Sequence, residues 1–397
     1  MTEQHSPIQF AKSYHLLQLA MIAAIAILCF MGSTTVNGYV LDGSGLMLGR
    51  DFLNMWHYGV AAFSENPAAY YDFDFYNAEL NKLIADYPYQ NWSYPPHFML
   101  IAAPFGLFGY NAALVLMTGL SVLCFWYFIV KDFEDSAYRQ SIWLMPAFLF
   151  ALICGQLSVL LAAILIGIYR NMDSRPILTG ILIALLTVKP QVGFLFPLFL
   201  IATQRWTVLL SASIATIAFI GASILIYGME IWDVFLFSQV GEQSNLLFNS
   251  HPLTRGLMPS LAANLGIIGL NKSIALGLHS AVAIMAVAAM VWCCLKSTDR
   301  FLQYAVFVTT SFVATPYLMA YDTIILCWIA VHLLARYGAN NWQKMSYRFI
   351  FALIPVGIAL SMLNIPGSSL IVLSLLFWAL SETGVFNRKE VNLQPAE

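Results

Sequence analysis

Three charged residues stand out because each lies alone beside a long apolar segment, where an unpaired charge is costly. Asp51 is in LGRDFLNMWHYG, Lys189 in LLTVKPQVGF and Asp322 in ATPYLMAYDTIIL. A carboxylate can take the proton of an attacking hydroxyl, and an ammonium can stabilise a departing phosphate. Asp51 and Lys189 are therefore candidates for these two roles in a group-transfer reaction. Asp322 is suited equally to a substrate contact and to an ion pair with Lys189 or Arg255.

Two of these candidates also have a purely structural interpretation. Asp51 directly precedes an amphipathic stripe, so its side chain could cap the start of a helix. The apolar or small residues of that stripe are Phe52, Met55, Trp56, Gly59, Val60 and Phe63. Trp56 on such a stripe favours a helix that lies in the membrane interface. Lys189 precedes the helix-breaking Pro190 and could instead extend its ammonium to the membrane surface.

Further polar residues fall in predicted outer loops or near the outer ends of predicted helices. They are His57, Tyr94, His97, Gln156, Gln191, His251 and Arg255. Arg255 and His97 are candidate partners of a donor phosphate. Tyr94, Gln191 and His57 are candidate contacts to the rest of the substrate. Their shared location, rather than any one of them, indicates a binding site.

The elements that position these residues must lie in a membrane. The chain has 397 residues, of which 60% are hydrophobic and 10% charged, and its mean hydropathy is +0.75. A soluble protein carries about 25% charged residues, so this composition is typical of an all-α polytopic membrane protein. The net charge of −2 gives no indication of a nucleic-acid partner. All six cysteines lie inside apolar segments and indicate neither a disulfide framework nor a metal site.

The apolar segments predict about 12 transmembrane helices in one domain, 1–397. They lie near 16–36, 110–130, 141–154, 157–170, 176–188, 191–204, 206–228, 273–296, 301–316, 321–335, 348–363 and 367–381. The apolar piece 97–109 is too short to cross, so we expect it to dip into the outer face. Two large outer loops result, at about 37–96 and 229–272. The first of them carries the interfacial helix.

The distribution of basic residues supports this arrangement with both termini in the cytoplasm. Thirteen of the 18 basic residues then fall on the cytoplasmic side, namely Lys12, Lys131, Arg139, Arg170, Arg175, Arg205, Lys296, Arg300, Arg336, Lys344, Arg348, Arg388 and Lys389. This excess follows the positive-inside rule. Counting 97–109 as a span would invert every later loop. The candidate site therefore belongs on the outer face.

Four segments resemble, in order, the motifs of glycosyltransferase family 87. They are RDFLNMWHYGVAAFSENPAAYYDFDFY, WSYPPHFMLIAAPFGLF, TVKPQVGFLFPLFLIATQRW and ATPYLMAYD, within residues 48–325. The resemblance implies a GT-C-type fold, a polyprenyl-phosphate sugar donor that often carries mannose, and a bacterial inner-membrane location. It also implies a catalytic carboxylate in the first outer loop, which Asp51 matches. The last motif departs from the family, since Met-Ala-Tyr precedes Asp322 where Trp or His is more usual.

We therefore expect an inverting hexosyltransferase, with mannose as the expected hexose and a lipid or glycan as acceptor. A lipid phosphate is already a good leaving group, so no cofactor, metal or nucleotide-binding domain is expected. The pair Asp72 and Asp74 could hold a metal ion, although such a pair in an outer loop is more often solvated. A transporter or lipid-linked sugar flippase is the alternative, although the sequence has no internal repeat. A non-catalytic membrane scaffold is a third interpretation.

Overall fold

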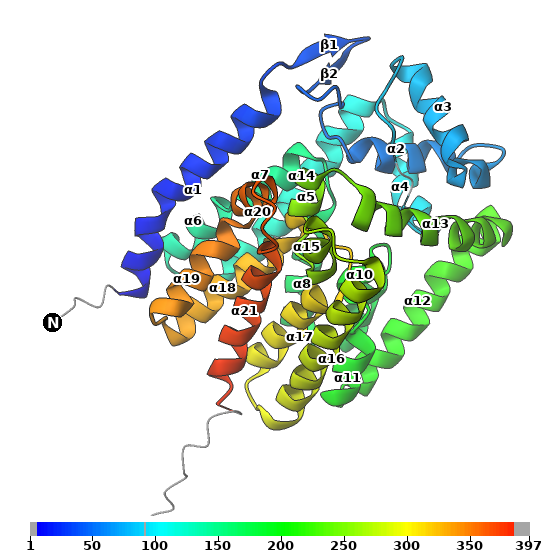
Figure 1. Ribbon diagram of the computed structural model, residues 1–397. Coiled ribbons are helices and arrows are strands. Elements are labelled where there is room, and N and C mark those ends of the chain that lie inside the picture. The colour runs from blue at the N-terminus through cyan, green and yellow to red at the C-terminus, as the bar shows by residue number, and fades with distance from the viewer. Residues whose placement is uncertain (1–5, 91–92, 385–397) are drawn as a thin grey trace, which may run out of the picture.

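The computed structural model describes residues 6–90 and 93–384, without the side chains of 238–245, and is mostly helical (Figure 1). The first outer loop contains a short hairpin and three helical segments: β1 Thr34–Val36, β2 Tyr39–Leu41, α2 Phe52–Ala61, η1 Pro67–Tyr71 and α3 Phe73–Leu83. The second contains α13 Glu230–Asn249, α14 Pro252–Gly256 and α15 Leu261–Ile267. Both loops are therefore largely helical.

The other elements form the body of the protein. Its first half contains α1 Pro7–Phe30, α4 Phe98–Gly106, α5 Tyr110–Asp132, α6 Ser136–Trp143, α7 Pro146–Ile153, α8 Ser158–Asn171 and α9 Pro176–Leu186. Its second half contains α10 Pro190–Gly193, α11 Phe196–Ala202, α12 Trp206–Tyr227, α16 Lys272–Lys296, α17 Arg300–Ala314, η2 Ala320–Thr323, α18 Ile324–Tyr337, α19 Asn341–Phe351, α20 Leu353–Met362 and α21 Ser368–Glu382.

Within the described residues, five helical segments are long and apolar enough to cross a membrane. They are α1, α5, α12, α16 and the unit Ala320–Tyr337, which joins η2 to α18. The pair α19 and α20, bent by 81°, passes the same test together. The shorter α8, α9, α10–α11 and α21 are also apolar. The structure is therefore that of a membrane-embedded helical protein, although several of the predicted spans are short or broken helices.

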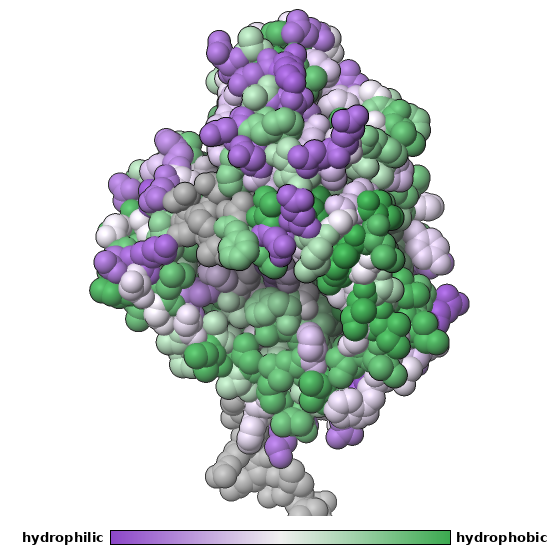
Figure 2. Space-filling view, turned by 90° about the vertical axis from the view of Figure 1, so that its right-hand side faces the viewer, coloured by the Kyte–Doolittle hydropathy of each residue, from purple (hydrophilic) through white to green (hydrophobic). Residues whose placement is uncertain are grey.

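The surface of the protein exposes many apolar side chains, as expected of a membrane-embedded protein. Leu225 on α12 is 89% exposed, and Ile217 on the same helix is 70% exposed. Figure 2 shows hydrophilic side chains gathered on the upper part of one face and apolar side chains on its lower part. A broad exposed apolar surface of this kind is unfavourable in water and favourable in lipid.

Two elements near the start of the chain differ from their predicted form. The first span was predicted at 16–36, but α1 begins at Pro7, where Ser6 caps it, and ends at Phe30. Residues beyond it form an antiparallel hairpin in which Thr34 pairs with Leu41. The interfacial helix is also more buried than predicted, since Phe52, Met55 and most other α2 residues are buried. Only Phe63, beyond the end of α2, is strongly exposed, at 62%.

The segment 97–109 does not form a helix long enough to cross. Helix α4 has nine residues, which span about 14 Å against a hydrocarbon thickness of about 30 Å. It packs against α2 through two glycines. A Cβ on Gly59 would lie 2.4 Å from the Ala102 carbonyl oxygen and 2.6 Å from the Gly106 nitrogen. This close contact joins α4 to the first outer loop.

Ion pairs gather at the end of the body opposite to the outer loops. Arg170 pairs with Asp132 at 3.0 Å, and Arg300 pairs with Asp173 at 2.7 Å. Arg205 also pairs with Asp173. These three arginines are among the thirteen basic residues predicted to lie on the cytoplasmic side.

Candidate active site

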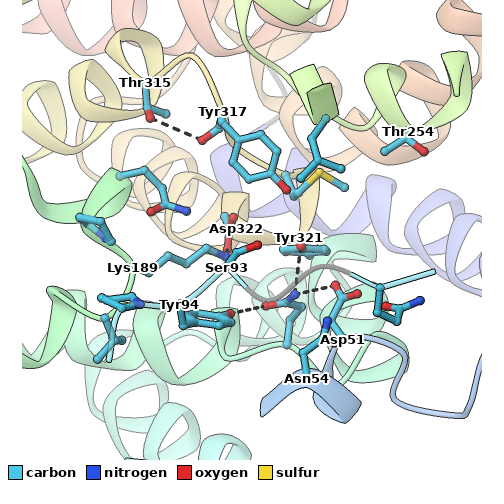
Figure 3. A pocket seen from close by; sticks show the side chains of 18 of the residues that line it. Asp51, Asn54, Ser93, Tyr94, Lys189, Thr254, Thr315, Tyr317, Tyr321 and Asp322 are labelled. Atoms are coloured by element: carbon cyan, nitrogen blue, oxygen red, sulfur yellow. Dashed lines mark hydrogen bonds and ion pairs between the residues drawn. The ribbon is translucent and has the colours of Figure 1, made fainter. Parts of the chain in front are cut away.

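A cavity of about 590 Å³ lies where the first outer loop meets the ends of several body helices (Figure 3). Asp51, Lys189 and Asp322 all line it, from α2, α10 and η2 respectively. These residues are more than a hundred positions apart along the chain. The structure therefore brings the three charged candidates into one cavity.

The backbone at Asp51 is held by the end of α7. The Gly49 amide donates to the Ile153 carbonyl at 3.2 Å, and the Asp51 amide donates to the Cys154 carbonyl at 3.0 Å. These bonds satisfy carbonyls that a helix end would otherwise leave unpaired. Gly155 then turns the chain with a φ of +60°, and a Cβ there would lie 2.7 Å from the Gly49 carbonyl oxygen. Only glycine permits this approach.

The Asp51 side chain does not cap α2, so the capping interpretation is wrong. Its Oδ2 instead accepts a hydrogen bond from Gln156 Nε2 at 2.5 Å. Burial raises the pKa of the Asp51 carboxyl above its ordinary value, against smaller lowering effects of the Gln156 hydrogen bond and the Lys189 charge. A raised pKa makes the ionised carboxylate a stronger base.

Gln156 connects the two sides of the cavity. Its Nε2 also donates to the Tyr321 hydroxyl at 3.0 Å, and its Oε1 accepts from the Tyr94 hydroxyl at 3.3 Å. Figure 3 shows these bonds converging between Asp51 and Tyr321. Tyr321 is adjacent to Asp322, so the amide links the base candidate to the ion pair on the other wall.

Lys189 and Asp322 form a buried ion pair. Lys189 Nζ lies 2.5 Å from Asp322 Oδ1, and the Ser158 hydroxyl donates to the same oxygen at 2.5 Å. Lys189 is 6% exposed and Asp322 is 5% exposed. The membrane-surface interpretation of Lys189 is therefore wrong. Asp322 pairs with Lys189 rather than with Arg255.

The remaining candidates divide into two groups. Tyr94 and Gln191 line the cavity. His97 is buried behind it, where Nε2 lies 3.1 Å from the Thr187 hydroxyl and the ring stacks on Trp232. Arg255 donates to the Gly266 carbonyl at 2.6 Å and is not among the residues that line the cavity.

His57 is likewise outside the cavity lining. Its ring is 5% exposed and packs against Trp56, Tyr70 and Tyr76. Burial lowers the pKa of His57 to about 4, so the ring is neutral at pH 7. In this structure neither His57 nor Arg255 is positioned for direct contact with a molecule in the cavity.

Sequence reasoning missed several polar groups that line the cavity, including Asn54, Ser93, Tyr317 and Tyr321. Asn54 could have been found, because it lies three residues after Asp51 and so shares its helix face. Its side-chain oxygen accepts from the Tyr76 hydroxyl. Tyr317 and Tyr321 come from an irregular segment, and no periodic pattern predicts the direction of their side chains.

The Asp72 and Asp74 pair has a structural explanation. Asp72 caps α3 by accepting from the Phe75 amide at 2.9 Å, and Asp74 lies in the first turn of that helix. Acidic residues at these positions stabilise a helix start. Among the residues that the structure describes, no three His, Cys, Asp or Glu side chains are grouped so as to hold a metal ion.

These observations define a helical membrane protein with a polar, charge-lined cavity at one end. The sequence profile of glycosyltransferase family 87 matches residues 92–316, which is more than half of the chain. The chain therefore belongs to glycosyltransferase family 87 and is a glycosyltransferase. The matched range includes Tyr94, Gln156 and Lys189, whereas Asp51 and Asp322 lie outside it. Comparisons with curated proteins and with solved structures gave no match.

Proposed function

We propose that this protein is a GT-C-type enzyme that transfers a hexose, expected to be mannose, from a polyprenyl-phosphate donor to a lipid or glycan acceptor. The observation that carries the proposal is the cavity that Asp51 shares with the Lys189–Asp322 pair. One wall supplies a base for the acceptor, and the other supplies a cation for the donor phosphate. The family membership favours this reaction over a transporter or flippase.

Asp51 is the proposed general base. The acceptor hydroxyl gives its proton to the carboxylate as its oxygen forms a bond to C1 of the sugar, while the bond from C1 to the phosphate oxygen breaks. One base is sufficient for a direct displacement, which inverts the configuration at C1. The polyprenyl phosphate departs with the electron pair, so the reaction needs no resident cofactor or metal.

Lys189 is the proposed partner of the departing phosphate. Its ammonium is neutralised by Asp322 in the free enzyme, which keeps a buried cation in place until the donor arrives. Negative charge builds on the phosphate oxygen in the transition state, where a fixed cation is most effective. Tyr94 and Gln191 line the same cavity and are proposed contacts to the donor.

A second, apolar groove supports a lipid-linked donor. It has a volume of about 400 Å³ and lies between α9, α10, α11 and α12, with Leu186, Phe196 and Ile217 among its lining residues. Pro190 lines both the groove and the cavity. A prenyl chain in the groove would therefore place its phosphate beside Lys189.

A large side chain placed in the groove should raise KM for donors with a long prenyl chain and leave KM for short-chain donors unchanged. Thr216 lines the groove, so Thr216→Trp should raise KM for a long-chain donor about tenfold, the effect of losing roughly two buried methylenes. A short-chain donor that does not reach the groove should be unaffected. Ile214→Trp is the matched control, since Ile214 is 59% exposed on the same helix and does not line the groove. Equal KM values for both donors in Thr216→Trp would contradict this placement of the tail.

We propose a topology in which both termini are in the cytoplasm of a bacterium and the cavity opens at the outer face of its inner membrane. Twelve passes result if α6 with α7, α10 with α11, η2 with α18 and α19 with α20 each count as one. Short, broken spans of this kind are tolerated where neighbouring helices cover their ends. The surrounding lipids are then the direct partners of the exposed apolar helices.

Cysteine labelling tests this topology. In a cysteine-free background, an impermeant maleimide added outside should label cysteines placed at positions 74 and 233, because both lie on outer-loop helices and are exposed. It should not label positions 134 and 342 until the membrane is permeabilised. Labelling of position 134 from outside would reject the twelve-pass arrangement.

The proposed reaction itself is tested with purified protein in liposomes. A radiolabelled polyprenyl-phosphate mannose is supplied with membrane glycolipids, and transfer is followed by mass spectrometry of the products. Polyprenyl-phosphate glucose and a nucleotide sugar are the matched alternatives. Transfer from the nucleotide sugar alone would overturn the proposed donor class.

A further inference from the structure

We propose that Gln156 is a positioning residue that fixes the orientation of the Asp51 carboxylate and keeps it ionised. This inference rests on the proposed function, in which Asp51 is the general base. It adds a second requirement for catalysis, because the base must be both deprotonated and held with one oxygen toward the acceptor.

The hydrogen bonds of Gln156 determine which way its amide points. Its Oε1 accepts from the Tyr94 hydroxyl, so Nε2 is directed to Asp51 Oδ2 and the Tyr321 hydroxyl. Gln156 is 8% exposed, so solvent competes little for these bonds. A flipped amide would place its oxygen against the carboxylate, an arrangement that repels. The carboxylate, which only accepts, and the Tyr94 hydroxyl together fix the orientation of the Gln156 amide, and the amide in turn holds one oxygen of Asp51.

This arrangement has a direct chemical consequence. With Oδ2 held by the amide, Oδ1 is the oxygen at which the acceptor proton can be taken. A hydrogen bond donated to a carboxylate favours its charged form, which opposes the effect of burial. Gln156 thus allows a base to remain ionised in a site that would otherwise favour its protonation.

Other groups act on Asp51 from every side of the site. The titratable and charged groups that interact with it electrostatically are Arg50, Tyr76, Tyr87, Tyr94, Tyr110, Cys154, Lys189, Tyr317 and Tyr321, and Asp322 lines the same cavity. Arg50 is engaged by Asp42 at 2.6 Å. Lys189 is engaged by Asp322. The Gln156 amide donates to the Asp51 carboxylate at 2.5 Å and lowers its pKa more than the Tyr321 hydroxyl, which also hydrogen-bonds to it.

The test is the pH dependence of kcat in the purified enzyme with polyprenyl-phosphate mannose. Gln156→Met removes the amide at similar volume, and the acidic limb of the profile should move to higher pH by about one unit or more, as expected for the loss of a hydrogen bond to a charged group. Gln156→Glu should move it further, because two adjacent carboxylates share one proton. KM for the donor should stay within about twofold, the result expected of a residue that acts through the base.

Two further variants make the result specific. Tyr94→Phe leaves Gln156 in place but removes the hydroxyl that donates to its Oε1, so the amide is held less firmly and the acidic limb should move in the same direction by a smaller amount. Gln18→Met is the matched control, because Gln18 is also buried and loses a hydrogen bond to the Ser141 carbonyl far from the cavity. Its profile should not move.

The outcomes separate this inference from the proposed function. If the wild-type enzyme does not transfer from the polyprenyl donor, the proposed function fails. If the wild type is active and Asp51→Asn is not, the Gln156 variants decide the inference. An acidic limb that does not move in Gln156→Met overturns the role of Gln156. If Gln156→Met does not fold, the same result in Gln156→Glu overturns it. A fall in kcat with an unmoved limb also overturns it, because that result indicates packing alone.

Discussion

Asp51→Asn should lower kcat by about 10²–10⁴-fold, the usual cost of losing a general base. The asparagine side chain has nearly the same shape and can still accept from Gln156, so the cavity should keep its form and its affinity for the donor. It cannot take a proton at pH 7. The measurement is single-turnover transfer from polyprenyl-phosphate mannose, together with donor affinity.

The same variant should be at least as stable as the wild type. Burial raises the pKa of Asp51 in the folded state above its value of about 3.9 in the unfolded chain. The folded state therefore binds a proton more readily, and ionisation destabilises it as pH rises through the folded-state pKa. Asp51→Asn should thus have a higher Tm than the wild type at pH 7. The difference should fade as pH falls below the folded-state pKa and should be smallest below pH 4.

Asp72→Asn is the matched control for the base. Asp72 lies in the same outer loop and caps α3, and asparagine is an equally good cap. This variant should turn over at the wild-type rate with an unchanged Tm. Near wild-type turnover by Asp51→Asn would remove Asp51 from the mechanism, whereas a lowered Tm would indicate that its charge is structural.

The sequence predicted those helices whose apolar segments were long and unbroken. The segments near 110–130, 206–228 and 273–296 correspond to α5, α12 and α16. Other predicted spans are divided by turns near Pro146 or Pro190, or bent as at the start of α20. Hydropathy is summed over a window and carries no information about such breaks. The amphipathic stripe after Asp51 predicted α2, whereas the other helices of the two outer loops were missed because polar helices leave no membrane signal.

The candidate site was predicted in part for a similar reason. Charge and topology placed Asp51, Lys189 and Asp322 at the same end of the protein, and the structure brings them to one cavity. A predicted topology assigns a residue to one side of the membrane but gives no side-chain direction. Arg255 was therefore grouped with the site residues, although its side chain donates to the Gly266 carbonyl and does not line the cavity. The Gln156–Asp51 bond joins residues 105 positions apart, a distance at which no local pattern can predict a contact.

The buried ion pair changes what is expected of Lys189→Met. If Lys189 contacted only the donor, this variant would fold normally and lose donor affinity alone. In the structure the substitution leaves Asp322 buried without its cation, since their side chains are 7% and 2% exposed. Removing one partner of such a pair typically costs about 3–5 kcal/mol. Lys189→Met should therefore show a markedly lower Tm in detergent as well as weak donor binding.

The double variant Lys189→Met with Asp322→Asn separates these two effects. It removes both charges, so no ion is left buried, and the Ser158 hydroxyl can still donate to the new amide oxygen. Its Tm should return most of the way to that of the wild type, whereas its affinity for polyprenyl-phosphate mannose should stay low, because the phosphate has lost its cation. The affinity is measured by titration calorimetry in detergent against the unphosphorylated prenol, whose binding should be equal in both proteins. Wild-type affinity for the phosphate in the stable double variant would mean that Lys189 only neutralises Asp322, and that another group binds the donor.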